Sequence, residues 1–289
     1  MINLPFLFTP PLNRKKFHIR CDMEGISGVV NLAQVTPGNS EYPEAREHFM
    51  AELIALIEGL REGGAEEVSV YDEHWFGRNL DLSRLPEGVS AFCGKPPYRG
   101  DWAGGLDGSH AGMILHGLHS KAGSGHLLCH TYEPDFADIS LNGRSVGEIG
   151  LETAIAGEWG VPLVLVIADS AGVDEARQLL PGIAAVATKI SQSGDGAECF
   201  SLHDNIATIR QAAARIASAA GESQLFQIPP PITLALKFHR GPYLEALRAQ
   251  EFARFQEADT LLLQGNSITA LWAEYWQIKL GIQRELAAP

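Results

Sequence analysis

The chain has 289 residues, of which 45% are hydrophobic and 20% are charged, as is ordinary for a soluble globular protein with a sizeable core. Its 22 basic and 35 acidic side chains give a formal net charge of −13, which argues against a surface for nucleic acid or an anionic membrane. The four cysteines stand far apart with no CxxC pair, which excludes a zinc ribbon and a dithiol redox motif.

The first 15 residues, MINLPFLFTPPLNRK, resemble a signal peptide only superficially. The apolar run is short and interrupted by proline, and the basic residues follow it instead of preceding it. No stretch of the chain approaches the roughly 20 apolar residues that a membrane span requires. We therefore expect a cytoplasmic protein in which residues 1–15 form an N-terminal extension.

The first predicted elements form a β-α-β unit. Residues 17–21 mix apolar and β-favouring side chains, which predicts a strand. Apolar residues at helical spacing predict a helix over 42–62, and a pair of glycines ends it. Residues 67–71 are predicted as the second strand, and polar residues of the kinds that bind metals follow both strands.

The middle of the chain continues as alternating strands and helices. Strands are predicted over 89–93, 111–115, 161–168 and 182–190, and helices over 148–159, 173–180 and 204–219. The run at 161–168 is continuously apolar, as in a central strand covered on both faces. Asn142-Gly143 predicts a hairpin turn, and the glycine-containing segments 96–108 and 193–199 are predicted as loops.

Three prolines at 229–231 mark the clearest change of composition, since they enforce an extended segment. Beyond them we predict strands over 232–238 and 260–264 and helices over 242–255 and 268–286. The predicted fold class is α/β, a three-layer sheet with helices on both faces, plus a smaller C-terminal α+β portion. We place the α/β domain at residues 16–222 and the smaller portion, packed on it, at residues 223–289.

Asp22 and Glu24 stand one residue apart directly after the first predicted strand. Strand side chains alternate, so both carboxylates point the same way, at the edge of the sheet where open α/β proteins bind ligands. Gly25 and Gly28 allow a tight turn there. One interpretation is a site for one or two cations. The other is a helix N-cap or Asx-turn at Asp22, with Glu24 solvated in the first turn.

Histidines are concentrated in the middle of the chain, where five of the ten fall within 21 residues: His110, His116, His119, His126 and His130. Imidazole is the commonest metal ligand and a natural acid–base group. Glu148, which opens the helix predicted over 148–159, also has two interpretations. It is either a metal ligand or the partner of Ser145 in a capping box.

The candidate ligands together are too many for a closed four-coordinate structural zinc site. They are Asp22, Glu24, His74, His119, His130 and Glu148. Three carboxylates with two or three histidines suit two cations that share a bridging carboxylate. Such a pair of cations, on the order of 3.5–4 Å apart, lowers the pKa of a bound water molecule. It also stabilises both the attacking and the leaving oxygen atoms of a displacement reaction.

Five blocks of sequence, in the same order, resemble the zinc-dependent D-aminopeptidases of the DppA type. They are Asp22-Met-Glu-Gly-Ile-Ser-Gly28, Asp72-x-His74, Gly117-x-His119, His130 eleven positions later, and Gly147-Glu148 eighteen beyond that. The similarity runs from about residue 17 to the end and weakens after residue 191.

This resemblance implies a site with two zinc ions and a defined set of residues. The implied ligands are Asp22, which would bridge the metals, Glu24, His74, His119 and Glu148, and the implied catalytic histidine is His130. It would handle the proton, stabilise the oxyanion or attack the substrate. The resemblance also implies release of the N-terminal D-amino acid from short peptides by a ring-like homo-oligomer, such as a decamer.

The chain departs from the family pattern in several places. Family members usually have Asn where this chain has Glu152, one helical turn after Glu148. An added acid there could favour a more cationic substrate, or Glu152 could be a solvated helix residue. The segment 191–199 (SQSGDGAEC) also differs, and we interpret the unmatched His116 and His126 as structural or supporting residues.

Three rival functions are compatible with parts of the pattern. A metal-dependent amidohydrolase on the same scaffold could act on an amide other than a D-peptide. A peptide-binding transport component with structural metals would need export, and the lack of a signal peptide argues against it. A magnesium site for phosphoryl transfer would leave the histidines without a role, because magnesium prefers oxygen ligands.

Overall fold

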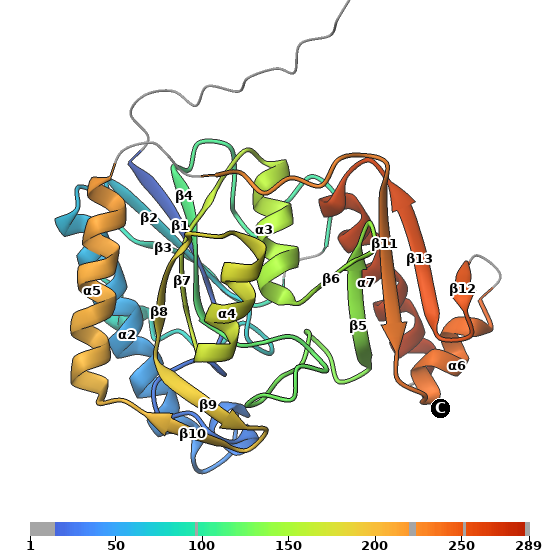
Figure 1. The fold of residues 1–289 in the computed structure, drawn as a ribbon, viewed down its shortest axis with the longest axis horizontal. Coiled ribbons are helices and arrows are strands. Elements are labelled where there is room, and N and C mark those ends of the chain that lie inside the picture. Colours follow the sequence, from blue (N-terminus) through green and yellow to red (C-terminus); the bar gives the residue numbers. More distant parts are fainter. Residues whose placement is uncertain (1–14, 96–97, 220–223, 251–252, 287–289) are drawn as a thin grey trace, which may run out of the picture.

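Figure 1 shows the fold in a computed structural model, which describes residues 15–95, 98–219, 224–250 and 253–286. The N-terminal extension predicted at 1–15 lies outside the described residues, apart from Lys15. Within the part of the chain that the structure describes, every helix is too short or too polar to cross a lipid bilayer.

The main sheet has six parallel strands in the order β3-β2-β1-β4-β7-β8. Their bounds are β1 Lys16–Cys21, β2 Glu67–Asp72, β3 Ser90–Phe92, β4 Gly112–Leu118, β7 Leu163–Ala168 and β8 Ala184–Ala187. The chain first adds β2 and then β3 on one side of β1, and it then returns to the other side of β1 to add β4, β7 and β8. The carboxyl ends of β1 and β4 therefore form the switch point at which open α/β sheets bind ligands.

Helices cover both faces of this sheet (Figure 1). Their bounds are α2 Tyr42–Glu62, α3 Glu148–Glu158, α4 Ser170–Leu179 and α5 Leu202–Ser218. In β4, Ile114 packs into the core beneath α2 and α5, while its neighbours Met113 and Leu115 pack into the core beneath α3. This alternation is expected of a strand buried on both faces. The predicted three-layer α/β class is confirmed.

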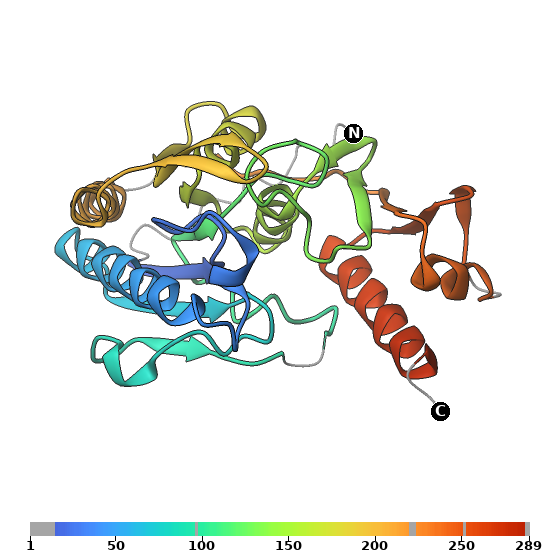
Figure 2. The same ribbon diagram turned by 90° about the horizontal axis from the view of Figure 1, so that it is seen from below.

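A second, antiparallel sheet has the order β12-β13-β11-β5-β6. Its strands are β5 Phe136–Leu141, β6 Arg144–Val146, β11 Ile232–Phe238, β12 Phe255–Glu257 and β13 Thr260–Gly265. Helices α6 (Pro242–Arg248) and α7 (Ile268–Leu286) accompany it, with α7 the long red helix of Figure 2. This sheet joins strands β5 and β6, from the predicted α/β domain, with strands β11, β12 and β13, from the predicted smaller portion. The domain boundary between residues 222 and 223 stays a prediction.

Three predicted elements differ from the structure. The strand predicted over 182–190 is two strands, β8 and β9 (Lys189–Ser193), because Thr188 between them bonds the loop after β1. The loop predicted over 193–199 contains β10 (Gly196–Cys199), which forms a hairpin with β9. The helix predicted over 242–255 ends at Arg248, and Phe255 pairs with β13. Helix-favouring residues at 246–251 misled the prediction, and tertiary pairing outweighed propensity.

Gly117 allows the loop after β1 to lie against the end of β4. The register of β4 shifts between His116 and Leu118, and Gly117 adopts a φ of +80°. The N–H of Gly25 donates to the carbonyl oxygen of Gly117 over 2.7 Å. A Cβ atom at Gly117 would lie 2.0 Å from the carbonyl oxygen of Asp22. Only glycine fits this close approach.

We expect Gly117→Ala to lower the free energy of unfolding by about 3 kcal/mol, because it adds both a backbone strain and a steric overlap. Gly123→Ala is the matched control, since Gly123 has a φ of +77° with no atom within 4 Å of the added Cβ. It should cost only about 1–2 kcal/mol. Urea unfolding measures both values, and equal losses would show that the contact with Asp22 is unimportant.

Candidate metal centre

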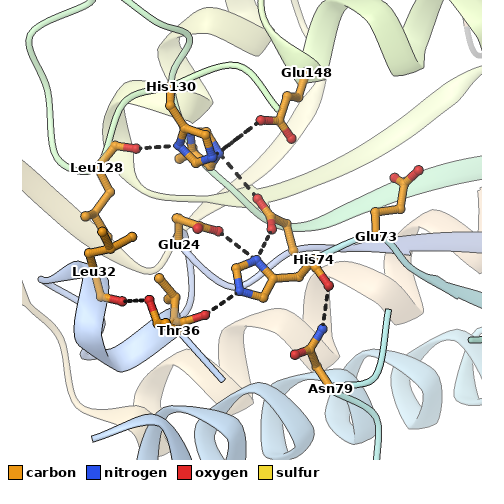
Figure 3. A network of polar contacts seen from close by, with 12 residues as sticks. Glu24, Leu32, Thr36, Glu73, His74, Asn79, Leu128, His130 and Glu148 are labelled. Carbon is orange, nitrogen blue, oxygen red and sulfur yellow. Dashed lines mark hydrogen bonds and ion pairs between the residues drawn. The ribbon is translucent and has the colours of Figure 1, made fainter. Parts of the chain in front are cut away.

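The structure brings the six candidate side chains together at the carboxyl ends of β1, β2 and β4 (Figure 3). Asp22 and Glu24 follow β1, His74 follows β2, His119 follows β4, His130 lies in the loop before β5, and Glu148 is the first residue of α3. They form two groups, each close enough to hold a metal ion. The first group is Asp22, Glu24 and His74, and the second is His119, His130 and Glu148.

Asp22 lies between the two groups. Its Oδ1 is 2.8 Å from Nδ1 of His74, and its Oδ2 is 3.4 Å from Nε2 of His119. Glu24 Oε2 is 3.2 Å from the same His74 nitrogen. A carboxylate with one oxygen directed at each group has the arrangement of a bridging ligand.

The second group is arranged around Glu148. Its Oε1 is 3.4 Å from Nε2 of His119 and 3.9 Å from Nε2 of His130. The two imidazole rings stack, with centroids 4.2 Å apart and planes 9° apart. The His130 side chain is 34% exposed, whereas that of His119 is buried, so His130 lies on the open side of the group.

Main-chain carbonyl oxygens orient all three histidines. His74 Nε2 donates to Val35, His119 Nδ1 donates to Ser120 and His130 Nδ1 donates to Leu128, over distances of 2.6–2.9 Å. In a neutral imidazole, the ring nitrogen bonded to a carbonyl oxygen carries the proton, so the other nitrogen is the one that can present its lone pair to a metal ion. In each histidine that second nitrogen faces the carboxylates, as a metal ligand or proton acceptor requires.

Three buried atoms in the centre, Asp22 Oδ2, Glu24 Oε2 and His119 Nε2, make only ion-pair contacts of 3.2–3.4 Å and no hydrogen bond among the described residues. A buried polar atom left without a partner costs about 1–3 kcal/mol, so folded proteins rarely leave several together. Carboxylate oxygen and imidazole nitrogen are ligands that zinc accepts. These residues therefore fit a pair of divalent cations.

The charges of the centre also favour cations. Burial by itself would lower the pKa of His74, but the carboxylates of Glu24 and Asp22 outweigh it and raise the pKa well above its usual value. His119 behaves in the same way, because Asp22 and Glu148 outweigh the effect of burial on its pKa. Burial would raise the pKa of Asp22, yet the two histidines lower it well below its usual value. Positive charge therefore stabilises this centre.

The two local interpretations without a metal are wrong. Asp22 and Glu24 are only 7% and 4% exposed, so Glu24 is not solvated. The turn after β1 is not closed by the Asp22 side chain, because its Oδ1 bonds His74 and its Oδ2 has no hydrogen bond among the described residues. Glu148 does not belong to a capping box. The N-cap of α3 is Gly147, without a side-chain cap, and Ser145 lies in β6.

His116 and His126 lie outside the two groups. His116 is buried, with Nε2 3.2 Å from Glu52 Oε2, and its ring stacks on Phe49. Glu52 in turn accepts the N–H of Ser27. His116 thus supports the loop at 22–28 from beneath, whereas His126 is exposed.

Lys189 was not predicted from the sequence, yet it holds the loop that carries Glu24. Its side chain is fully buried, and Nζ donates to the carbonyl oxygens of Glu24 and Ile26 over 2.6 and 2.7 Å. Burial lowers its pKa to about 8. A single lysine inside the apolar stretch predicted as a strand over 182–190 was the one available signal.

Glu175 on α4 was also missed, and it joins the segments of His119 and Glu148. One carboxylate oxygen accepts the N–H of Lys121 over 2.8 Å, and the other accepts the N–H of Gly147 over 3.1 Å. The junction is tight, because a Cβ at Gly147 would lie 2.5 Å from Glu175 Oε1. Burial raises the pKa of Glu175 above its usual value.

Comparison with known proteins shows the family of this chain. The sequence model of a family described as D-aminopeptidase matches residues 16–275. The chain belongs to the D-aminopeptidase family. The family resemblance expected from the sequence is thereby confirmed, and with it the expectation of an aminopeptidase.

A curated sequence and a solved structure are similar to this member of the D-aminopeptidase family. A D-aminopeptidase from Bacillus subtilis (strain 168) is 29% identical over 187 residues, which are 64% of this chain and 68% of that protein. The solved structure of the Zn-dependent D-aminopeptidase DppA from Bacillus subtilis, a self-compartmentalizing protease, has the same fold. It matches with a TM-score of 0.87 and 23% identity over 93% of this chain and 98% of that one.

We expect Glu175→Gln to lower the free energy of unfolding by about 1–3 kcal/mol, although the side chains have the same shape. Glutamine has a single oxygen, so its NH₂ group would face the N–H of either Lys121 or Gly147. Urea unfolding and amide hydrogen exchange at both residues measure the effect. Asp174→Asn, at the exposed neighbouring position of α4, is the control. Unchanged stability and exchange in Glu175→Gln would contradict the joining role.

Proposed function

We propose that this D-aminopeptidase family member is a zinc-dependent hydrolase that releases N-terminal D-amino acids from short peptides, with two zinc ions per subunit. The observation that carries the proposal is Asp22, a buried carboxylate with one oxygen toward each ligand group. The zinc dependence of the Bacillus subtilis neighbour supports the choice of metal.

The ligands divide naturally between the two proposed ions. Asp22, Glu24 and His74 would hold one, and Asp22, His119 and Glu148 would hold the other, with Asp22 shared. Zinc bound here supplies Lewis acidity toward the scissile carbonyl group and makes water a nucleophile near neutral pH. The protein contributes the fixed orientation of the ligands, since each histidine is held by a carbonyl oxygen.

His130 is the proposed catalytic histidine. Its Nδ1–H is engaged by the carbonyl oxygen of Leu128, so Nε2 presents a lone pair. Its side chain is also the most exposed of the three centre histidines, so substrate can reach it. These properties suit a general base that accepts a proton at Nε2 and returns it to the departing amine.

We also propose that the protein assembles as a ring-like homo-oligomer, of which a decamer is one possible size. The support is that the Bacillus subtilis structure is that of a self-compartmentalizing protease. Enclosure within such an assembly would restrict access to short peptides. The cytoplasmic location stays a prediction from the sequence.

The proposed function is tested by metal content together with hydrolysis of D-alanine and L-alanine p-nitroanilides. We expect about two zinc ions per chain, and release of p-nitroaniline from the D-substrate that a chelator abolishes and zinc restores. If the protein binds two metal ions but cleaves neither substrate, the metal centre is kept and its substrate is an amide other than these. A protein that neither contains nor takes up metal would overturn the proposal.

Two alanine substitutions separate ligand from catalyst. His119→Ala should lose zinc and activity together, because it removes a buried ligand of the second group. His130→Ala should keep its zinc and lose activity by at least about 100-fold, as expected for a general base. Metal analysis and the D-alanine p-nitroanilide assay measure both. Loss of zinc in His130→Ala would make His130 a ligand, and a wild-type rate would remove it from the mechanism.

A further inference from the structure

Glu152 is buried beside the metal centre and is paired there. The residue is 2% exposed, so the interpretation as a solvated helix residue is wrong. It lies one helical turn after Glu148 on α3, hence on the same face of the helix. Its carboxylate is engaged by Arg20 and by the hydroxyl group of Tyr132 instead of being directed to solvent.

Tyr132 contacts two of the three glutamates of α3, Glu148 and Glu152. Its main-chain N–H donates to Glu148 Oε1 over 2.6 Å, and its hydroxyl group donates to Glu152 Oε1 over 2.6 Å. The same residue is therefore held at its backbone and at the tip of its side chain by two carboxylates one turn apart. The contact with Glu148 involves the oxygen that faces His119 and His130.

The backbone of Tyr132 is strained. Its φ is +56°, in the left-handed region that residues other than glycine rarely adopt. Such a conformation persists only where surrounding contacts hold it. Here the ring packs on Trp272, with centroids 4.8 Å apart, and the hydroxyl group is fixed by Glu152. The strained backbone is what aims the N–H at Glu148.

Arg20 keeps Glu152 in place. It lies on β1, two residues before Asp22, and it is 3% exposed. Its guanidinium group contacts Glu152, donates to Glu73 Oε1 over 3.0 Å and donates to the carbonyl oxygen of Ala103 over 2.7 Å. A buried carboxylate needs a partner of opposite charge, and Arg20 is that partner.

We propose that Glu152 is a positioning residue of the metal centre, which acts through the hydroxyl group of Tyr132 to hold the main-chain N–H of Tyr132 on the ligand Glu148. Arg20 anchors Glu152 for this purpose. The proposal rests on the proposed function only in taking Glu148 as a zinc ligand. It gives the acid at this position a role in metal binding rather than in the recognition of a cationic substrate.

The test measures zinc affinity of the full-length protein in competition with a chelator. Tyr132→Phe keeps the ring and removes only the hydroxyl group, and we expect it to weaken zinc binding by about 10-fold. Glu152→Leu should weaken binding to a similar extent, and the combination of both changes should be no worse than either. Glu152→Gln keeps an oxygen acceptor for the hydroxyl group and should remain close to the wild-type protein.

Two further readouts make the test specific. The visible absorption of the cobalt-substituted protein, which reports the geometry of the ligands, should change in Tyr132→Phe. It should not change in Tyr243→Phe, which removes a hydroxyl group on α6, a helix that contributes no residue to either ligand group. A role of Glu152 limited to neutralising Arg20 would make Glu152→Gln as harmful as Glu152→Leu and leave Tyr132→Phe unaffected.

The positioning role and the ligand role fail in different ways. One outcome is that Glu148→Gln loses zinc while Tyr132→Phe and Glu152→Leu bind zinc within twofold of the wild-type protein. This outcome would overturn the positioning role of Glu152 and keep the assignment of Glu148 as a zinc ligand. Multiplied losses in the combined variant would also overturn it, because two links of one chain of contacts cannot act independently. If Glu148→Gln itself binds zinc normally, the ligand assignment is wrong, and the positioning role falls with it.

Discussion

The buried carboxylate of Asp22 is the constraint on which the rest of the centre depends. A buried carboxylate is costly unless positive charge and hydrogen bonds surround it, and here a histidine approaches each of its oxygens. To hold that arrangement, the fold places a glycine where β4 meets the loop and a buried lysine beneath Glu24. Glu175 then joins the segments that carry His119 and Glu148. The centre is thus built chiefly by main-chain contacts around a few charges.

The sequence alone predicted the elements and site positions that depend on neighbouring residues in the chain. Alternating and continuous apolar runs predicted the strands of the main sheet, and the carboxyl ends of parallel strands necessarily share one edge. Asp22, His74 and His119 could therefore be placed together from the order of residues alone. Their assignment as zinc ligands came from the family resemblance and remains a proposal. The structure adds that a carbonyl oxygen orients each histidine.

The features that escaped prediction depend on contacts between distant parts of the chain. Lys189 and Glu24 are 165 positions apart, and no local pattern links them. The sequence left Glu152 as either an added acid near the metals or a solvated helix residue, because its partner, Arg20, lies on a strand near the start of the chain. The end of α6 was misplaced for a related reason, since only pairing with β13 makes residue 255 part of a strand.

The second sheet has a consequence for how the two ligand groups respond to disturbance. Asp22, Glu24 and His74 all follow strands of the main sheet, which is held on both faces by helices. His130 and Glu148 instead flank the β5–β6 hairpin, which belongs to the second sheet. A shift of that sheet would therefore displace His130 and Glu148 relative to the candidate ligands that follow strands of the main sheet, which include His119 after β4. The two ligand groups are thus mechanically unequal, because only the group that contains His130, the proposed catalytic residue, has members beside the second sheet.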